Sequence, residues 1–347
     1  MPFFNVFLRT LGFLIGITVF IILLNLLFYI FPEEKENFDF VEGNKESNNI
    51  IAILDLNGPI INNFNQSLVG DLFEYITPNR VKNYLSNLKK IKPNILIIKI
   101  NSPGGTVTAT ASLEKIINDF KKENKIEVYF YSNEILASGG YWVATSGDKI
   151  YANYGSIIGS IGVSGPSWYY FDKPISVSRG IIGQKIETKN GIKVYDQNAG
   201  TSKDLYNPFR KPKDEELSHL NEIVMEIYDD FLIKVSNARK IEINILKNEI
   251  GALIYSATQA KKNFLIDDIL DIDLLIDRII TDKNFIDYKI LKMNVSESLI
   301  SKYLVNYFDV KNSKICNKLN SNFVSIFPYF LNNCWSFNIT YILNFHN

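Results

Sequence analysis

Histidine and cysteine are nearly absent from this sequence, and their scarcity removes several classes of function. The 347 residues include two histidines and two cysteines, so no cluster of these residues is available to bind a metal. Neither sign of charge dominates, because 37 basic side chains balance 37 acidic ones. This balance leaves no excess of positive charge that would favour binding to nucleic acid. The chain also lacks a Walker or dinucleotide-binding glycine motif, and we expect it to use no cofactor and no metal.

The two histidines are poorly placed for a Ser-His-Asp triad. His219 lies in an amphipathic helical pattern over 214–240, where an exposed position is the simpler interpretation, and His346 is the penultimate residue. A serine nucleophile in this chain therefore needs another base, and lysine is the leading alternative. A lysine acts as a base only when its environment lowers its pKa. Periodicity does not choose among the candidates, which are Lys185, Lys189, Lys193 and Lys203.

Two apolar runs end in glycine-rich turns, and these turns carry the main signal for function. Ile95–Ile100 leads into Asn-Ser-Pro-Gly-Gly at 101–105, and Ile126–Tyr131 is followed by Ala-Ser-Gly-Gly-Tyr at 137–141. Each turn precedes a helical pattern, whose first backbone N–H groups are unpaired and can receive negative charge. Taken singly, each turn is more often structural, and Ser138 could simply cap a helix. Together they favour acyl transfer, with a nucleophile beside a cradle for the oxyanion.

The stretch from about 51 to 280 resembles the signal peptide peptidase A family of membrane-anchored serine proteases. Its motifs occur in order as the two turns above, Gly-Ser-Ile-Gly at 159–162, and Ala-Gly-Thr-Ser-Lys-Asp at 199–204. The resemblance implies an α/β fold, namely the spiral of ββα units shared by Clp protease and crotonase. It also implies a serine endopeptidase that cleaves extended apolar peptides, such as signal-peptide remnants or misfolded membrane-associated polypeptides.

The resemblance assigns roles to individual residues. It makes Ser138 the nucleophile, Lys203 the general base and Ser160 the residue that orients the lysine. Backbone N–H groups of Gly139 and of Gly104 or Gly105 form the oxyanion hole. The rival lysines at 185, 189 and 193 lie in a segment typical of a hairpin with an Asn190-Gly191 turn, where charged side chains are usually solvated. The glycine-rich segment 153–162 predicts a strand edge beside the bound peptide.

Two other functions stay open at this point. The same spiral fold serves acyl-CoA enzymes of the crotonase type, although the serine placement and the lack of a basic nucleotide-binding patch argue against coenzyme A. A non-catalytic membrane-anchored scaffold of the same fold is the second alternative. The scaffold is the minority interpretation, because the chain keeps Ser138, Ser160 and Lys203.

The first part of the chain predicts a single membrane anchor. Leu11–Phe31 is uncharged and long enough to span the hydrocarbon core, and the acidic segment that follows offers no signal-peptidase site. Arg9 precedes the apolar run, so the positive-inside tendency leaves the amino terminus in the cytoplasm. We therefore expect contact with membrane lipid and a catalytic domain on the extracytoplasmic side.

The remaining pattern predicts how the chain is divided. We expect an anchor at 1–31, a polar linker at 32–49, a peptidase domain at 50–284 and a carboxyl-terminal tail at 285–347. Strand patterns at 50–56, 94–100, 126–131 and 148–152 alternate with helical ones at 106–121 and 138–146, which favours a largely parallel sheet. A long helix over 214–240 carries an apolar stripe. The resemblance implies that such helices make subunit contacts in a homo-oligomer. The tail contains both Cys316 and Cys334, which alone do not establish a disulfide.

Overall fold

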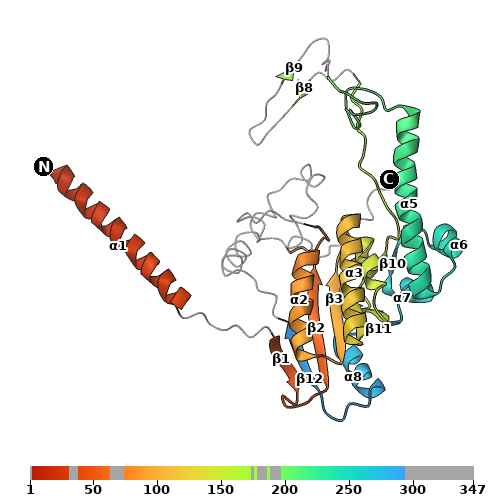
Figure 1. The fold of residues 1–347 in the computed structure, drawn as a ribbon, viewed down its shortest axis with the longest axis horizontal. Coiled ribbons are helices and arrows are strands. Elements are labelled where there is room, and N and C mark those ends of the chain that lie inside the picture. The colour runs from red at the N-terminus through yellow and green to blue at the C-terminus, as the bar shows by residue number, and fades with distance from the viewer. Residues whose placement is uncertain are drawn as a thin grey trace, which may run out of the picture. The chain divides into compact units, whose positions relative to one another are not determined.

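The computed structural model describes residues 2–30, 38–62, 74–172, 176–177, 186–187 and 197–293. The chain divides into two units, one ending at Asp39 and the other beginning at Phe40. The first consists mainly of helix α1 (Pro2–Ile30), and the second contains the sheets and the remaining helices (Figure 1).

Helix α1 is long and apolar enough, by length and composition, to cross a membrane. Its segment Phe4–Leu23 has a mean hydropathy of 2.4, and none of its residues is buried. The helix begins nine residues before the expected Leu11, so Arg9 lies within its first turns. Phe31, the expected end of the anchor, lies outside the described residues.

The second unit is built on a seven-stranded sheet. The order is β1-β12-β2-β3-β4-β6-β11, and the pairs from β12 to β11 are parallel. The strands are β1 (Phe38–Gly43), β2 (Ile50–Asn57), β3 (Ile95–Asn101), β4 (Glu127–Ser132), β6 (Lys149–Ala152), β11 (Asp268–Ile269) and β12 (Lys289–Met293). The continuous apolar runs of β2 and β3 fit this central position, because a parallel strand is covered on both faces.

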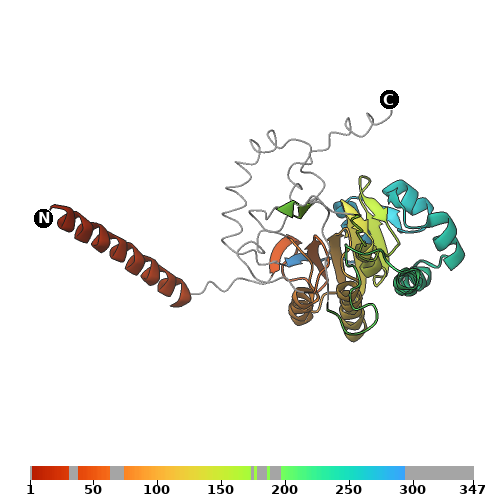
Figure 2. The ribbon, with the colours of Figure 1, turned by 90° about the horizontal axis from the view of Figure 1, so that it is seen from above.

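Helices cover both faces of this sheet. Helices α2 (Pro78–Ile91) and α3 (Val107–Asn124) lie side by side on one face, as Figures 1 and 2 show. Helix α8 (Ile272–Asp282) packs on the other face, where Leu275 and Ile279 join a core with Ile51 and Ile97. The alternation of side chains along each strand supplies both cores. The expected α/β class is thereby confirmed.

A second, three-stranded sheet lies at the carboxyl end of β3. Its order is β10-β7-β5, and Ser102 bridges to Leu136 of β5. The strands are β5 (Ile135–Ala137), β7 (Ile157–Gly159) and β10 (Ile254–Ser256), with the short helices α4 (Gly139–Ala144) and α7 (Ala257–Lys262) following β5 and β10. The prediction that segment 153–162 forms a strand edge is wrong, because β7 is paired on both sides. Small residues suit it since a Cβ on Gly159 would approach the Leu253 carbonyl oxygen to 2.7 Å.

Helix α5 (Asp214–Arg239) confirms the predicted long helix but buries its apolar stripe only in part. Phe231 and Val235, in the second half, are buried, whereas Leu217 and Ile223 are more than 40% exposed. Figure 1 shows the first half of α5 extending beyond α3. The helix is followed by α6 (Ile243–Ile245) and the π-helical turn η2 (Leu246–Ile250).

Two expected boundaries differ from the structure. The predicted linker at 32–49 contains β1, which pairs with β12, and β12 itself lies beyond the predicted domain end at 284. The sheet therefore includes residues before and after the predicted domain, and the domain extends to Met293. Of the predicted hairpin, β9 (Ile186–Glu187) pairs with the upstream β8 (Ser176–Val177). The Asn190-Gly191 turn, the three rival lysines and both cysteines lie outside the described residues.

Candidate active site

Ser138 occupies a strained turn between β5 and α4. It is the N-cap of α4, with φ 52° and ψ −125°, a backbone conformation that residues other than glycine rarely adopt. Its side chain does not cap the helix. Among the described residues its hydroxyl has no hydrogen-bond partner, so the structure gives the simple capping interpretation no support. A sharp strand-to-helix turn of this kind presents a hydroxyl outward, toward a substrate.

Two backbone N–H groups beside Ser138 are available to an oxyanion. Within the described part of the chain, the N–H groups of Gly105 and Gly139 donate to no acceptor. The N–H of Gly104, by contrast, already donates to the Ser102 hydroxyl at 3.2 Å. The geometry therefore separates the alternatives left open by the sequence and favours Gly105 over Gly104 as the second donor.

Gly104 has a different role, which is to let two turns approach each other. Its φ is 103°, and a Cβ at this position would lie 2.8 Å from both the Gly139 nitrogen and the Ser138 Cβ. A Cβ on Gly139 would meet the Thr110 hydroxyl at 2.6 Å. Both separations are too short for any real side chain, so the glycines are required for the two strand ends to meet.

Ser160 lies beside Ser138 because their strands are paired in register. Ala137 of β5 faces Gly159 of β7, and the Ser138 N–H donates to the Gly159 carbonyl at 2.9 Å. Ser138 directly follows Ala137, and Ser160 directly follows Gly159. Ser160 also has a positive φ, 51°, and its hydroxyl has no hydrogen-bond partner among the described residues. The structure therefore brings these two predicted site residues together.

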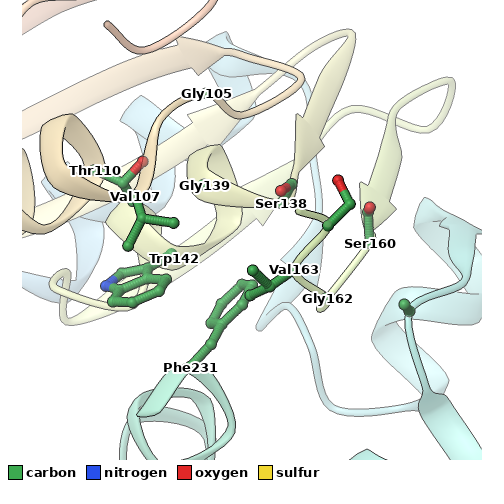
Figure 3. A pocket seen from close by; sticks show the side chains of 12 residues that line it. Gly105, Val107, Thr110, Ser138, Gly139, Trp142, Ser160, Gly162, Val163 and Phe231 are labelled. Atoms are coloured by element: carbon green, nitrogen blue, oxygen red, sulfur yellow. The ribbon is translucent and has the colours of Figure 1, made fainter. Parts of the chain in front are cut away.

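Both serines line one cavity of about 270 Å³. Figure 3 shows their hydroxyls on one side and the rings of Trp142 and Phe231 on the other. Val107 and Val163 complete an apolar wall, and Gly105 and Gly139 also line the cavity. Hydroxyls of Ser138, Ser160, Ser164 and Thr110 supply the polar part of the lining, and the apolar wall opposite suits an apolar side chain beside a reacting carbonyl.

The aromatic wall is fixed by polar contacts behind it. The Trp142 ring stacks on Phe231 with centroids 4.9 Å apart, and its indole N–H donates to Glu114 at 2.8 Å. Lys234 pairs with the same carboxylate at 2.9 Å and lies over the indole ring. This wall was not predicted from the sequence, although Trp142 is four residues after Ser138 and so lies on the next turn of α4.

Asn101 joins three strands behind the site. Its side-chain oxygen accepts hydrogen bonds from the Ser132 hydroxyl and from the N–H groups of Asn133 and Glu134, all within 3.2 Å. Its amide donates to the side-chain oxygens of Asn57 and Asn133. The residue thus connects the ends of β2 and β3 to the turn that leads into β5 and Ser138. It begins the Asn-Ser-Pro-Gly-Gly motif, but its role was not predicted.

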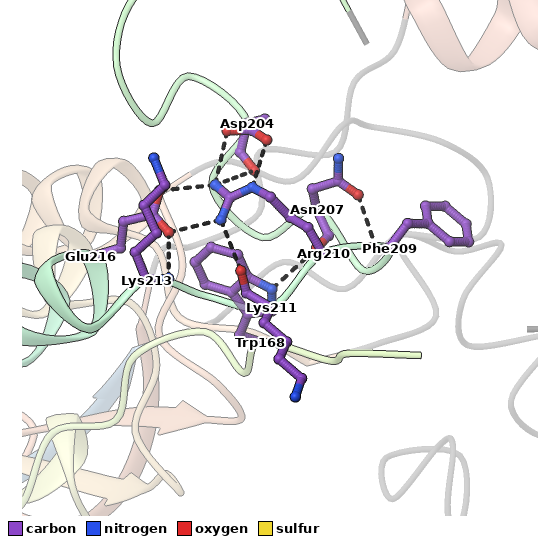
Figure 4. A network of polar contacts seen from close by, with 8 residues as sticks. All are labelled: Trp168, Asp204, Asn207, Phe209, Arg210, Lys211, Lys213 and Glu216. Atoms are coloured by element: carbon purple, nitrogen blue, oxygen red, sulfur yellow. Dashed lines mark hydrogen bonds and ion pairs between the residues drawn. The ribbon is translucent and has the colours of Figure 1, made fainter. Parts of the chain in front are cut away.

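Lys203 is not among the residues that line the cavity. It is exposed on a series of tight turns that precedes α5, with its N–H donating to the Gly200 carbonyl at 3.3 Å. Its neighbour Asp204 forms a forked ion pair with Arg210, which in turn pairs with Glu216 (Figure 4). The structure thus holds the predicted base on an ordered turn without placing it in the cavity of its own chain. His219 is exposed on α5, as expected.

Comparison with known proteins identifies the family of this chain. The model of Peptidase family S49 matches residues 120–285. "Putative protease MJ0651" of Methanocaldococcus jannaschii is 30% identical over 270 residues, which are 74% of this chain and 78% of that protein. "Putative signal peptide peptidase SppA" of Enterococcus faecium is 31% identical over 218 residues, 60% of this chain. The chain spans 59% of the length of that relative.

Two solved structures of a protein described as the 1510-N membrane-bound stomatin-specific protease are also similar. Their TM-scores are 0.40 and 0.41 at 16% and 15% identity, with 67% and 74% of this chain and 85% and 98% of theirs covered. The sequence matches decide the classification. This chain belongs to peptidase family S49, which confirms the resemblance drawn from its motifs.

Proposed function

We propose that this protein is a membrane-anchored serine endopeptidase in which Ser138 is the nucleophile and Lys203 the general base. One observation carries the proposal. In a single cavity, a hydroxyl on a strained turn lies beside the N–H groups of Gly105 and Gly139, and none of the three has a hydrogen-bond partner among the described residues. A nucleophile next to a preorganised pair of donors is what acyl transfer requires.

The reaction follows from these positions. The Ser138 oxygen attacks the scissile carbonyl while the neutral amine of Lys203 takes the hydroxyl proton. Negative charge develops on the carbonyl oxygen, which accepts hydrogen bonds from Gly105 and Gly139. The lysine then returns its proton to the leaving amine, and water releases the acyl group from Ser138. The family resemblance gives Ser160 the role of orienting the lysine amine.

The exposed position of Lys203 supports an assembled active site. The lysine does not line the cavity of its own chain, and apolar residues on the first half of α5 are exposed. In the proposed homo-oligomer, the lysine turn of one protomer reaches the Ser138 cavity of its neighbour. An isolated monomer then has a nucleophile but no base and is inactive.

The apolar wall and helix α1 support the proposed substrates and location. Trp142, Phe231 and Val107 favour an apolar side chain next to the scissile bond. Helix α1 then anchors the protein among lipids, with the peptidase domain on the extracytoplasmic side. The proposed substrates are extended apolar peptides that remain in or near the membrane, such as signal-peptide remnants or misfolded membrane-associated polypeptides.

The test is peptide cleavage by the full chain purified in detergent. We expect Ser138→Ala and Lys203→Ala each to abolish cleavage of an apolar signal-like peptide. The matched controls are Ser112→Ala and Lys89→Ala, which alter exposed residues of α3 and α2 away from the cavity. Activity that survives Lys203→Ala would return the search for a base to the three rival lysines. Wild-type protein that cleaves no apolar or unfolded peptide would favour the scaffold.

Mixing the two inactive variants tests the shared site. If the lysine serves a neighbour, co-assembled Ser138→Ala and Lys203→Ala chains recover roughly a quarter of wild-type activity, because random mixing completes about one interface in four. If serine and lysine act within one chain, the mixture stays inactive.

A further inference from the structure

Arg210 is the centre of a charged network immediately after the lysine turn. Its guanidinium donates to both Asp204 carboxylate oxygens, at 2.6 and 2.8 Å, and to both Glu216 oxygens, each at 2.8 Å (Figure 4). These two bidentate pairs use four of the five guanidinium N–H groups, and Arg210 also donates to the Lys211 carbonyl at 3.1 Å, an arrangement that a lysine cannot reproduce. The Glu216 side chain is only 4% exposed and also accepts the Lys213 N–H, which satisfies the N-cap backbone N–H of α5.

The same turn is tied to the chain that leaves the cavity. The Trp168 ring packs against Tyr206 and lies under the Arg210 guanidinium, 5.1 Å from its centre. Its indole N–H donates to the Asn207 carbonyl at 3.1 Å, and the Phe171 N–H donates to the Pro208 carbonyl at 2.8 Å. Trp168 follows Ser160 by eight residues, so the lysine turn and the segment leaving the cavity form one connected structure.

The backbone around Lys203 requires such support. Ser202, directly before the lysine, has φ 59°, and Tyr206 has φ 64°. Left-handed conformations at residues other than glycine and asparagine are unfavourable by about 1 kcal/mol or more each, and they persist where side-chain contacts fix them. The contacts of Arg210 and Trp168 are those that hold this turn.

We infer that Arg210 is a positioning residue for the proposed base, because it fixes the turn that presents Lys203 onto the amino terminus of α5 through Asp204 and Glu216. The inference rests on the proposed function, since it needs Lys203 to be the base. It holds whether the lysine acts in its own chain or on a neighbour, because the network lies within one chain and moves with the lysine.

Arg210 also affects the charge next to the lysine. Asp204 is adjacent in sequence, and an unpaired carboxylate there favours the protonated amine, which is inactive as a base. The groups around the turn are the carboxylates of Asp204 and Glu216, the guanidinium of Arg210, and the amines of Lys211 and Lys213. Removing Arg210 leaves two carboxylates without their shared cation. We therefore expect the acid limb of the activity profile to move to higher pH.

The experiment compares Arg210→Gln, Arg210→Lys and Lys203→Ala in the full chain, with kcat and KM measured across pH. We expect Arg210→Gln to lower kcat by at least about tenfold with KM changed less than about twofold. The acid limb of kcat/KM should move up by roughly half to one pH unit. Arg210→Lys should recover part of the loss, because it keeps the charge without the fork.

Two further variants separate positioning from general destabilisation. Arg278→Gln removes a partly buried arginine that pairs with Asp268, outside the lysine turn, and should leave kcat and the pH profile unchanged. Asp204→Asn combined with Arg210→Gln should return the acid limb toward wild type while kcat stays low. Wild-type kcat and pH profile in Arg210→Gln, with Lys203→Ala inactive, would refute the inference alone. An active Lys203→Ala variant would refute the dyad and this inference together.

Discussion

Replacing Asn101 by alanine should weaken the fold and the site together. The side chain is 9% exposed and makes five hydrogen bonds, to groups on β2, β4 and the turn before β5. Alanine removes all of them and leaves the N–H groups of Asn133 and Glu134 without acceptors. The turn they belong to leads directly to Ser138.

The magnitude follows from those bonds. A hydrogen bond contributes about 1 kcal/mol net, so five set an upper value of about 5 kcal/mol. Four of the five bonds are only partly buried, and water replaces some of these when they are lost, which leaves about 3 kcal/mol. For a domain of this size that loss lowers Tm by about 6–12 °C. Displacement of Ser138 should also lower kcat by about 100-fold.

Thermal and urea denaturation, with kcat measured on folded protein, test these values. Ser132→Ala removes one of the five bonds and should cost about 1 kcal/mol. Asn101→Asp keeps the three accepted bonds, and the amides of Asn57 and Asn133 can turn to donate to it, so its cost should also be about 1 kcal/mol. A loss below about 1 kcal/mol in Asn101→Ala, or equal losses in all three variants, would refute the connecting role.

Three further predictions concern the cavity and the lysine turn. Gly104→Ala should lower kcat by about 100-fold, since its Cβ would meet Ser138, whereas Gly155→Ala, with open space around it, should match wild type in the same peptide assay. Trp142→Ala should cost about 3–5 kcal/mol and Trp142→Phe, which keeps the stacking, about 1 kcal/mol in urea denaturation. Hydrogen bonds from Arg210 lower the pKa of Glu216 to about 2 from an ordinary 4.5. Its stabilisation is therefore complete above about pH 4.5 and is lost as the pH falls toward 2, and Glu216→Gln should flatten that part of a pH–stability curve.

The elements with continuous or alternating apolar runs were predictable from the sequence. The strands β2, β3, β4 and β6 and the helix α3 fall within a few residues of their expected ranges, because burial on a parallel sheet imposes a pattern on each segment separately. The edges of the sheet were not predictable in this way. Strand β1 (Phe38–Gly43) is almost wholly exposed, and its acidic surroundings resemble a linker, so only its pairing with β12 identifies it.

The site was predictable to the level of motifs but not of geometry. The glycine motifs located the two turns, yet the sequence did not distinguish Gly104 from Gly105 as a donor. That distinction depends on the Ser102 hydroxyl, which occupies the Gly104 N–H, and hence on the conformation of a single turn. The wall formed by Trp142 and Phe231 joins α4 to α5 across 89 residues, and such a contact has no local signature.

The two halves of the proposed dyad are held by different forces, and their responses to substitution should differ. Ser138 is fixed by strand pairing, buried packing and glycine contacts that allow no side chain, so changes around it damage fold and chemistry at once. Lys203 is fixed by a network of ion pairs centred on Arg210, outside the sheets and their cores. Changes there can move the base while both sheets and their cores keep their packing. The pH dependence of kcat, rather than Tm, is therefore the measurement that reports on the lysine turn.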